Sequence, residues 1–266
     1  MSKIFLTAQN IDIYNDDNLD QYARTGATSA KQIYNAGADG VILGHSEVGD
    51  APAVVKSKFL TIVQNTDDSH FLEKITLLVG ESWDEFQGRT IEAIAAILTD
   101  HLTDILKDIP QNYLENLVIG YEPKWGSRGS GHDDVPPPNP KQISIICKKI
   151  RSALVTLVGE DIGNNIPIIY GGRSTPERTN EILADENIEG LILGSACNTI
   201  EKTMDIADVM AKIRPDKRKI LHANFKAFDL SDSYEEYIKT LKALDDSFTI
   251  YLSPCHADLR EVKKFL

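Results

Sequence analysis

Eight short apolar segments recur along this chain, and each is followed by a longer segment with a helical pattern. The apolar segments cover residues 4–8, 41–44, 76–80, 118–121, 167–170, 191–194, 220–223 and 249–253. Their apolar residues are mostly consecutive rather than alternating, which is typical of parallel strands buried on both faces. The clearest helical patterns cover residues 29–36, 90–106, 141–157, 175–184, 200–213, 233–244 and 257–266.

Eight such units in 266 residues predict an α/β fold in which the strands close into a (β/α)8 barrel. A doubly wound open sheet is the structural alternative. It would normally carry a G-x-G-x-x-G turn after a strand, and the sequence contains none.

Composition limits the partners. The net charge is −12, from 28 basic and 40 acidic residues, which disfavours nucleic acid but still allows a small anionic substrate. No apolar run approaches 18 residues, so we expect no membrane span. The N-terminal apolar stretch is too short for a signal peptide, and Cys147, Cys197 and Cys255 lack metal or CxxC spacing. We therefore expect a reduced, cytoplasmic setting.

In a (β/α)8 barrel the active site forms at the C-terminal ends of the strands. Chemically distinctive residues follow most of the predicted strands: Gln9 and Asn10; His45, Ser46 and Glu47; Glu81; Glu122; Gly172, Arg173 and Ser174; Gly194 and Ser195; Asn224 and Lys226. Each alone has a structural explanation, such as a turn glutamate or a solvated lysine. Their shared position is the functional signal.

The segment 118–140 is the most informative of these ends. Glu122 follows an apolar strand directly, Pro123 and Trp125 are the expected fixed hinge, and residues 124–132 form a loop containing Gly126, Gly129 and Gly131. A base on a rigid strand end beneath a mobile loop suits proton abstraction beside a carbonyl, which needs a base, an electrophile and exclusion of water.

Four motifs resemble the triose-phosphate isomerase family: G-H-S-E at 44–47, Y-E-P-x-W at 121–125 with G-S-G at 129–131, Y-G-G at 170–172 and N-F-K at 224–226. The resemblance implies a single TIM-barrel domain over residues 1–266. It also implies a homodimer that isomerises a three-carbon sugar phosphate in glycolysis and gluconeogenesis, with no metal or other cofactor.

The resemblance also implies roles, and this family is itself a standard example of base and electrophile assignment. Glu122 is expected to move the carbon-bound proton, and neutral His45 to polarise the carbonyl. Lys226 and Asn224 are expected to stabilise negative charge, with Glu47 supporting the lysine. The expected phosphate contacts come from Gly129, from the turn Gly172, Arg173 and Ser174, and from Gly194 and Ser195, which are expected to open a helix.

The strand order differs from the family. The N-x-K strand, first in the family, is seventh here; the first strand here resembles the family's third, and the last resembles its second. This order predicts a circular permutation in which the family's ends are joined near residues 212–218. A barrel tolerates such a change because its connections are local.

Three regions depart from the family pattern. The loop after Glu122 is one residue longer and continues into a proline-rich stretch, and Arg173 replaces the usual serine, so we hypothesise that it either contacts phosphate or is displaced outward. In the expected dimer loop, Thr25 and Gly26 are kept while Ala27 replaces an acid.

Three alternatives stay open at this point. The longer loop allows a four-carbon sugar phosphate as substrate. A barrel hydrolase could pair Glu81 with Glu122, which requires carboxyl groups about 5–10 Å apart. A non-catalytic barrel that binds a phosphorylated ligand is the third.

Overall fold

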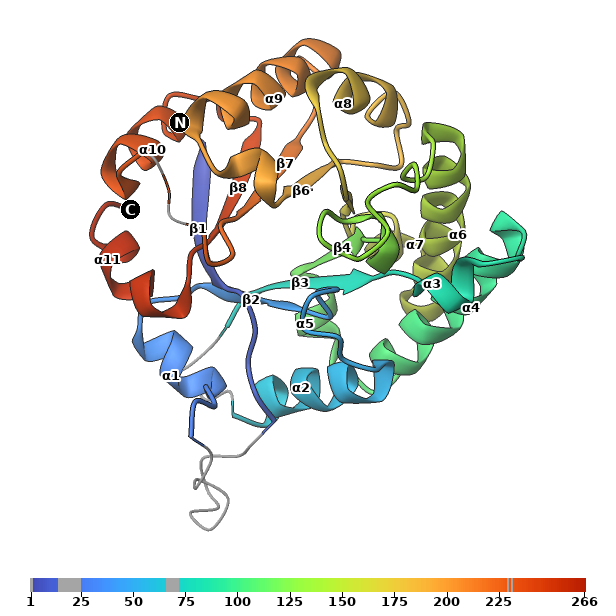
Figure 1. The fold of residues 1–266 in the computed structure, drawn as a ribbon. Helices are drawn as coiled ribbons and strands as arrows, with labels where there is room; N and C mark the ends of the chain where they lie inside the picture. The colour runs from blue at the N-terminus through green and yellow to red at the C-terminus, as the bar shows by residue number, and fades with distance from the viewer. Residues whose placement is uncertain (1, 14–24, 66–71, 229, 231) are drawn as a thin grey trace.

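A computed structural model describes residues 2–13, 25–65, 72–228, 230 and 232–266, and Figure 1 looks onto one end of its ring of strands. All strands are parallel, each pairs with its neighbour in sequence, and β8 pairs with β1 to close the barrel. The strands are β1 (Lys3–Ala8), β2 (Gly40–Leu43), β3 (Lys74–Val79), β4 (Leu117–Tyr121), β5 (Ile168–Gly171), β6 (Gly190–Leu193), β7 (Lys219–Asn224) and β8 (Phe248–Ser253). The predicted closed barrel is confirmed.

Helices surround the barrel in an outer layer (Figure 1). They are α1 (Ala30–Asn35), α2 (Pro52–Gln64), α3 (Trp83–Phe86), α4 (Ile91–Leu106), α5 (Gln111–Leu114), α6 (Pro140–Val158), α7 (Glu160–Gly163), α8 (Pro176–Ile182), α9 (Ile200–Ile213), α10 (Tyr234–Leu241) and α11 (Leu259–Lys263). The side chains of Thr90, Asn139, Thr175 and Thr199 cap the starts of α4, α6, α8 and α9 by accepting a backbone N–H. Helices α2, α3, α5 and α7 lie outside the predicted helical ranges.

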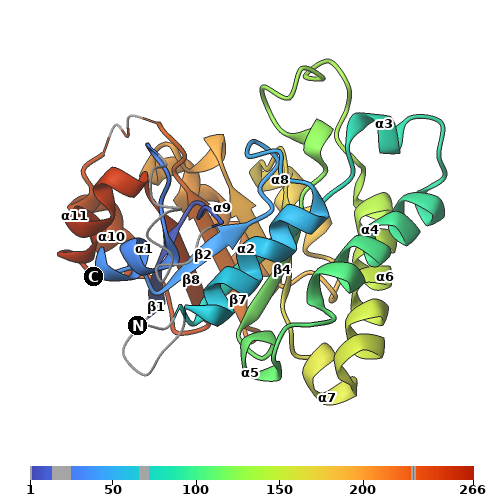
Figure 2. The ribbon, with the colours of Figure 1, turned by 90° about the horizontal axis from the view of Figure 1, so that it is seen from below.

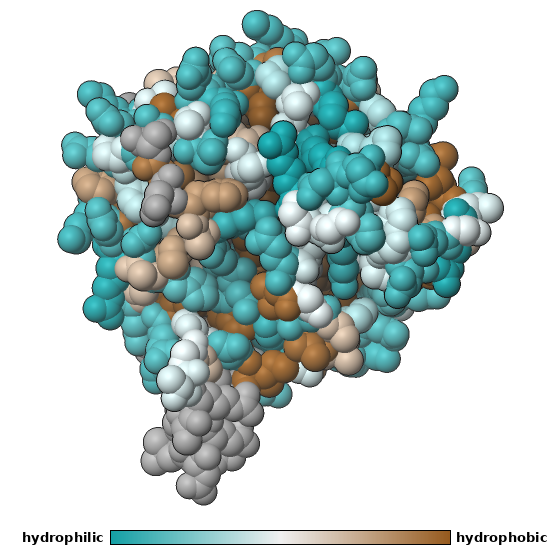
Figure 3. All heavy atoms as spheres, viewed as in Figure 1, coloured by the Kyte–Doolittle hydropathy of each residue, from teal (hydrophilic) through white to brown (hydrophobic). Residues whose placement is uncertain are grey.

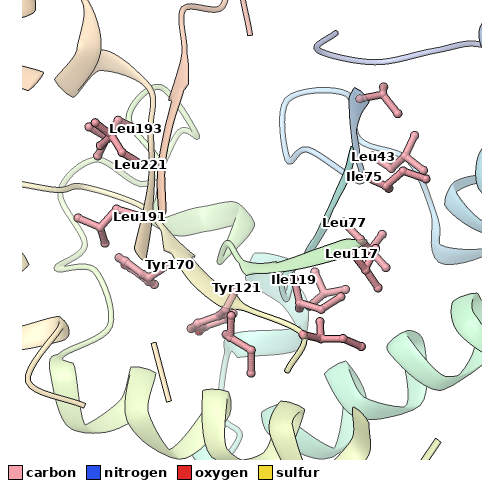
Figure 4. Close-up of a cluster of buried hydrophobic side chains, with 14 of the residues drawn as sticks. Leu43, Ile75, Leu77, Leu117, Ile119, Tyr121, Tyr170, Leu191, Leu193 and Leu221 are labelled. Carbon is pink, nitrogen blue, oxygen red and sulfur yellow. The ribbon is translucent and has the colours of Figure 1, made fainter. Parts of the chain in front are cut away.

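Side chains alternate across the barrel wall, as the two-residue period of a strand requires. Outward residues pack against the helices in one large core, part of which is shown in Figure 4, where Leu117, Ile119 and Tyr121 of β4 are labelled. Inward residues form a separate cluster of Ile42, Leu78, Val118, Ile169, Ile192, Ile220 and Tyr251. Both faces are apolar, which explains why the strands read as consecutive apolar runs.

A buried polar layer also lies inside the barrel. His222 Nε2 lies 2.8 Å from Ser253 Oγ, which lies 2.6 Å from Thr7 Oγ1, and Thr76 Oγ1 lies 3.4 Å from His222 Nδ1. Burial lowers the pKa of His222 to about 3, so this imidazole is neutral near pH 7.

The two ends of the barrel differ. Figure 2 shows the loop between β4 and α6 standing out at one end, on the same side as α3, while α5 and α7 lie at the other end. Figure 3 shows the end with the loop, where hydrophilic residues predominate. Within the described part of the chain, no helix combines the length and apolar character needed to cross a membrane.

Candidate active site

Strand alternation brings several of the predicted residues to the mouth of the barrel. On β4 the inward series runs through Val118 and Gly120 to Glu122, and on β7 it runs from Ile220 through His222 and Asn224 to Lys226. Ile192 and Gly194 continue the series at β6. Alternation therefore directs Glu122, Gly194 and Lys226 into one cavity of about 520 Å³. His45 does not follow this rule: it would continue the outward series of Val41 and Leu43, and it reaches the cavity after Gly44, whose φ of 78° interrupts the alternation of β2.

The Glu122 carboxylate is buried in this mouth, with its residue only 6% exposed. The Ser46 backbone N–H donates to its Oε2 at 3.2 Å, and the Ser127 hydroxyl donates to its Oε1 at 3.3 Å. His45 Nε2 lies 3.7 Å from the same Oε1. The carboxylate is thus held by two weak donors beside the imidazole.

The contacts of His45 assign its tautomer. The backbone N–H of Glu47 donates to His45 Nδ1 at 3.1 Å, so Nδ1 is an acceptor and the ring proton lies on Nε2. Nε2 faces Glu122 within the cavity lining. The imidazole therefore presents an N–H donor to the mouth, which is what polarising a carbonyl requires.

Lys226 is held in an unusual backbone conformation. Its φ of 52° is the only positive value among the non-glycine residues described. The Asn224 side chain accepts from its backbone N–H at 3.1 Å, and Gln9 Nε2 donates to its carbonyl at 2.8 Å. Its ammonium forms an ion pair with the Glu47 carboxylate. Contacts from Asn224 of its own strand and from Gln9 after β1 hold this backbone in a conformation that a lysine rarely adopts.

Gly194 lies against the Lys226 side chain where that side chain crosses the mouth. A Cβ added to Gly194 would lie 2.8 Å from Lys226 Cε. The predicted helix at Ser195 is only a three-residue 3-10 turn (Ser195–Cys197), and α9 begins at Ile200. Gly194 and Ser195 therefore open a short 3-10 helix and not α9 itself, and any contribution to anion binding comes from their local N–H groups.

Nearly all the predicted site residues line this one cavity: His45, Glu47, Glu122, Gly129, Gly172, Arg173, Gly194, Ser195, Asn224 and Lys226. Ser174 does not. It lines a neighbouring cavity of about 240 Å³, which shares Arg128, Gly172, Arg173 and Ser195 with the first.

The loop after Glu122 has a fixed base. Trp125 is 2% exposed, its ring centroid lies 4.1 Å from that of Phe86, and its Nε1 donates to Glu81 Oε1 at 2.9 Å. Ser130 Oγ donates to the Trp125 carbonyl at 2.8 Å. The Gly129 N–H, expected to meet phosphate, instead points to Asp133, with both carboxylate oxygens at 3.1 Å.

Arg173 lines the cavity and is held by the loop that follows Glu122. Its guanidinium donates to the carbonyls of His132 at 3.0 Å, Asp133 at 2.9 Å and Val135 at 3.1 Å. The side chain is 19% exposed, so it is not displaced into solvent. Its Nε has no hydrogen-bond partner among the described residues, and a contact with phosphate stays a prediction. It fixes the proline-rich end of the loop to the turn after β5.

Glu81 points away from the mouth. It continues the outward series of β3, and its Oε1 accepts from Tyr121 and Trp125. Burial raises its pKa to about 7. Glu81 does not line the cavity that holds Glu122, so the paired-carboxylate hydrolase loses its geometric basis.

Sequence reasoning assigned no site role to Gln9 or Ser127. Gln9 could have been found, because it continues the inward series of Phe5 and Thr7 on β1. Ser127 lies in a loop, where no periodicity predicts side-chain direction. Among the described residues, no three His, Cys, Asp or Glu side chains are arranged to hold a metal ion.

The family match and the similar proteins all carry the same family name. The sequence profile of the family described as triosephosphate isomerase matches residues 1–210. The chain is 32% identical over 178 residues to a triosephosphate isomerase of Mycoplasmoides gallisepticum, a match that covers 65% of each chain. It is 33% identical over 187 residues to one of Leptospira biflexa, covering 67% of this chain and 69% of the relative. A relative from Treponema denticola is 31% identical over 216 residues, with 77% and 76% covered. The first of these matches spans slightly less than two thirds of the relative's length. The chain belongs to the triosephosphate isomerase family.

Proposed function

We propose that this protein interconverts dihydroxyacetone phosphate and glyceraldehyde 3-phosphate by proton transfer through an enediolate. One observation carries the proposal: the Glu122 carboxylate, the Nε2–H of His45 and the Lys226 ammonium meet in one cavity although they follow three different strands. Family membership supports the same reaction.

Each polar residue at the mouth has a separate role in the proposed reaction. Glu122 removes a proton from the carbon beside the carbonyl, and the electron pair of that C–H bond forms the carbon–carbon double bond of the enediolate. The carbonyl oxygen gains the negative charge and accepts a hydrogen bond from His45 Nε2–H. The proton of the adjacent hydroxyl moves to this oxygen, and Glu122 returns its proton to the neighbouring carbon. The carbon–carbon double bond supplies the electron pair for that new C–H bond, and the pair of the broken O–H bond forms the new carbonyl. Lys226 and Asn224 stabilise the negative charge, and Glu47 positions the ammonium.

The phosphate end of the substrate lies toward Gly172, Gly194 and Ser195 in this proposal. These residues line the mouth at the ends of β5 and β6, the two strands that follow the strand of Glu122 around the ring. Two of them are glycines, which allow close approach of a ligand to the backbone. Closure of the loop 124–132 excludes water, which protects the enediolate from losing its phosphate.

We also propose that the chain is a circular permutant folded as one domain. The family match ends at residue 210, yet β7 and β8 follow it, close the ring and carry Asn224 and the strand end before Lys226. The short connection between α9 and β7 is anchored by Arg214, whose Nε donates to the Leu183 carbonyl at 3.1 Å. Both chain ends lie beside α10: the Ser2 N–H donates to Leu244, and Lys242 donates to Leu266.

A homodimer in the cytoplasm completes the proposal. Its support is the family resemblance and the position of Thr25 and Gly26, which are exposed beside the β1 end of the barrel. Arg24 of the same motif lies outside the described residues. Sedimentation at micromolar concentration is expected to give a dimer, and a monomer alone would contradict this part.

The test is a coupled assay on the purified chain. Turnover of glyceraldehyde 3-phosphate is expected, with little turnover of erythrulose phosphates. Preference for the four-carbon substrate would overturn the choice of substrate. Binding of glycerol 3-phosphate without any turnover would favour the non-catalytic alternative.

The permutation has its own test. A chain opened between residues 215 and 216, with residues 266 and 1 joined by a short linker, is expected to fold and to keep its activity. Failure of the rejoined chain to fold, under conditions where the original chain folds, would contradict the permutation.

A further inference from the structure

The loop over the mouth contains a carboxylate, that of Asp133, which accepts a hydrogen bond from the loop's own backbone. Both oxygens of the Asp133 carboxylate lie 3.1 Å from the backbone nitrogen of Gly129, four residues earlier. Gly129 has a φ of 77°, which a side chain would disfavour, and this conformation turns its N–H back toward Asp133. Gly129 also lines the mouth of the barrel.

The position of Asp133 is fixed from outside the loop. Arg173 donates to three backbone carbonyls of this segment, those of His132, Asp133 and Val135. Its guanidinium also lies 3.8 Å from the Asp133 carboxylate. The His132 ring stacks on Trp83 with centroids 4.3 Å apart. The backbone that carries the Asp133 carboxylate is therefore anchored, whereas the preceding segment, which the carboxylate contacts, contains Gly129 and Gly131.

We propose that Asp133 competes with the phosphate of a ligand for the Gly129 N–H, and that it thereby sets the affinity of the mouth for phosphorylated ligands. The proposal rests on the proposed function, because it assumes that this N–H turns to the ligand when the loop closes. In the unliganded protein, Asp133 satisfies the donor; in the closed state, the phosphate replaces it.

Charge explains why the exchange discriminates between ligands. A carboxylate ligand carries one negative charge, as Asp133 does, and gains little by replacing a tethered group of the same charge. A phosphate monoester carries about −1.5 to −2 near neutral pH and has three acceptor oxygens. It can therefore displace Asp133 while also accepting hydrogen bonds from donors on the opposite side of the mouth. The loop closes on phosphates in preference to carboxylates.

The cost of the exchange appears in the measured affinity. A ligand that needs the Gly129 N–H binds only the molecules in which Asp133 has left that N–H. The larger the fraction of molecules in which Asp133 still accepts from Gly129, the higher the apparent dissociation constant of the ligand. Asp133 is 55% exposed, so the contact is partly screened by water. One exposed hydrogen bond of this kind is expected to weaken binding by roughly two- to tenfold.

The experiment measures binding of glycerol 3-phosphate, which has the phosphate but no carbonyl, by calorimetry. Asp133→Ala is expected to lower the dissociation constant by roughly two- to tenfold. Asp133→Asn is expected to fall between Asp133→Ala and the original protein, because an amide oxygen still accepts a hydrogen bond without the charge. Asp134→Ala is the matched control, since Asp134 is an adjacent exposed carboxylate and its loss changes the net charge equally.

The same dissociation constant in Asp133→Ala and Asp134→Ala would overturn the proposal, because the effect would then be net charge alone. Weaker binding in both Asp133→Ala and Asp133→Asn would also overturn it and would make Asp133 a support of the loop. The readout is independent of turnover. A protein without isomerase activity in which Asp133→Ala tightens glycerol 3-phosphate would contradict the proposed function and leave this competition standing.

Discussion

Glu81 and Glu122 stand at the ends of neighbouring strands and yet belong to different regions of the molecule. Glu122 faces the mouth of the barrel beside His45, whereas Glu81 faces the outer layer beside Tyr121 and Trp125. Both are buried, with 6% and 1% of the residue exposed. The difference is one of register, since Glu81 continues the outward series of β3 after Val79, while Glu122 continues the inward series of β4 after Val118 and Gly120.

A carboxyl group with a perturbed pKa is therefore not by that fact a catalytic group. The pKa of Glu81 is raised to about 7 by burial, a value suited to a general base, but its carboxyl meets only protein groups that fix the loop hinge. Position relative to the cavity decides the role. Four substitutions test this division between the mouth and the outer layer.

Glu122→Gln is expected to have the largest effect. The amide keeps the acceptor for the Ser46 N–H but cannot take a proton, so kcat should fall by roughly 10²- to 10⁴-fold. The coupled assay measures the loss, and glycerol 3-phosphate binding checks that the mouth is intact. Retention of kcat would remove Glu122 from the mechanism.

Lys226→Met should come next. Methionine keeps much of the side-chain length and removes the charge that the enediolate requires, so kcat/KM should fall by roughly 10²- to 10³-fold. Unchanged kcat/KM would show that the ammonium pairs with Glu47 for structural reasons alone.

Gly194→Ala should act through Lys226. The new methyl group would lie 2.8 Å from Lys226 Cε and displace the end of that flexible side chain, which should lower kcat/KM by roughly tenfold. A double-mutant cycle supplies the control, because Gly194→Ala should add almost nothing in the Lys226→Met background. Full additivity would mean that Gly194 acts independently of Lys226.

Glu81→Gln should have the smallest effect on turnover and a clear effect on stability. In the original protein, an unfolded Glu81 ionises above about pH 4.5 while the folded one stays protonated to about pH 7. The folded state then binds more protons, so the free energy of unfolding falls as pH rises through this window, by about 3 kcal/mol in total. Glutamine removes that loss while its oxygen still accepts from Trp125.

Urea unfolding at pH 5 and pH 8 measures this difference. Glu81→Gln should gain stability relative to the original protein at pH 8 and keep its turnover. A large fall in kcat with unchanged KM would instead place Glu81 in the chemistry and break the comparison.

The sequence predicted the frame of this site well because strand periodicity is a local property. Eight apolar runs gave the barrel, and the strand-end positions of His45, Glu122 and Lys226 placed them in one mouth. Counting alternate residues along β3 through Gly80 would also have assigned Glu81 to the outward series, whereas the same count on β4 assigns Glu122 to the inward series.

The loop was harder to predict because its contacts depend on tertiary structure. The clamp by Arg173 joins residues about forty positions apart, and the bond from Gly129 to Asp133 depends on a glycine conformation that many sequences allow. The 3-10 helix at Ser195 likewise shows that a Gly-Ser pair alone does not predict the type or the length of the helix that it opens.

The most direct test of the central claim is isotope incorporation during turnover in D2O, followed by proton NMR. We expect the protein to introduce deuterium at the carbon beside the carbonyl of the triose phosphates while it interconverts them, because Glu122 exchanges its proton with solvent between removal and return. Glu122→Gln should introduce none above the uncatalysed rate. Interconversion without deuterium uptake, or uptake by Glu122→Gln at the original rate, would contradict proton transfer by Glu122 at the mouth of this barrel.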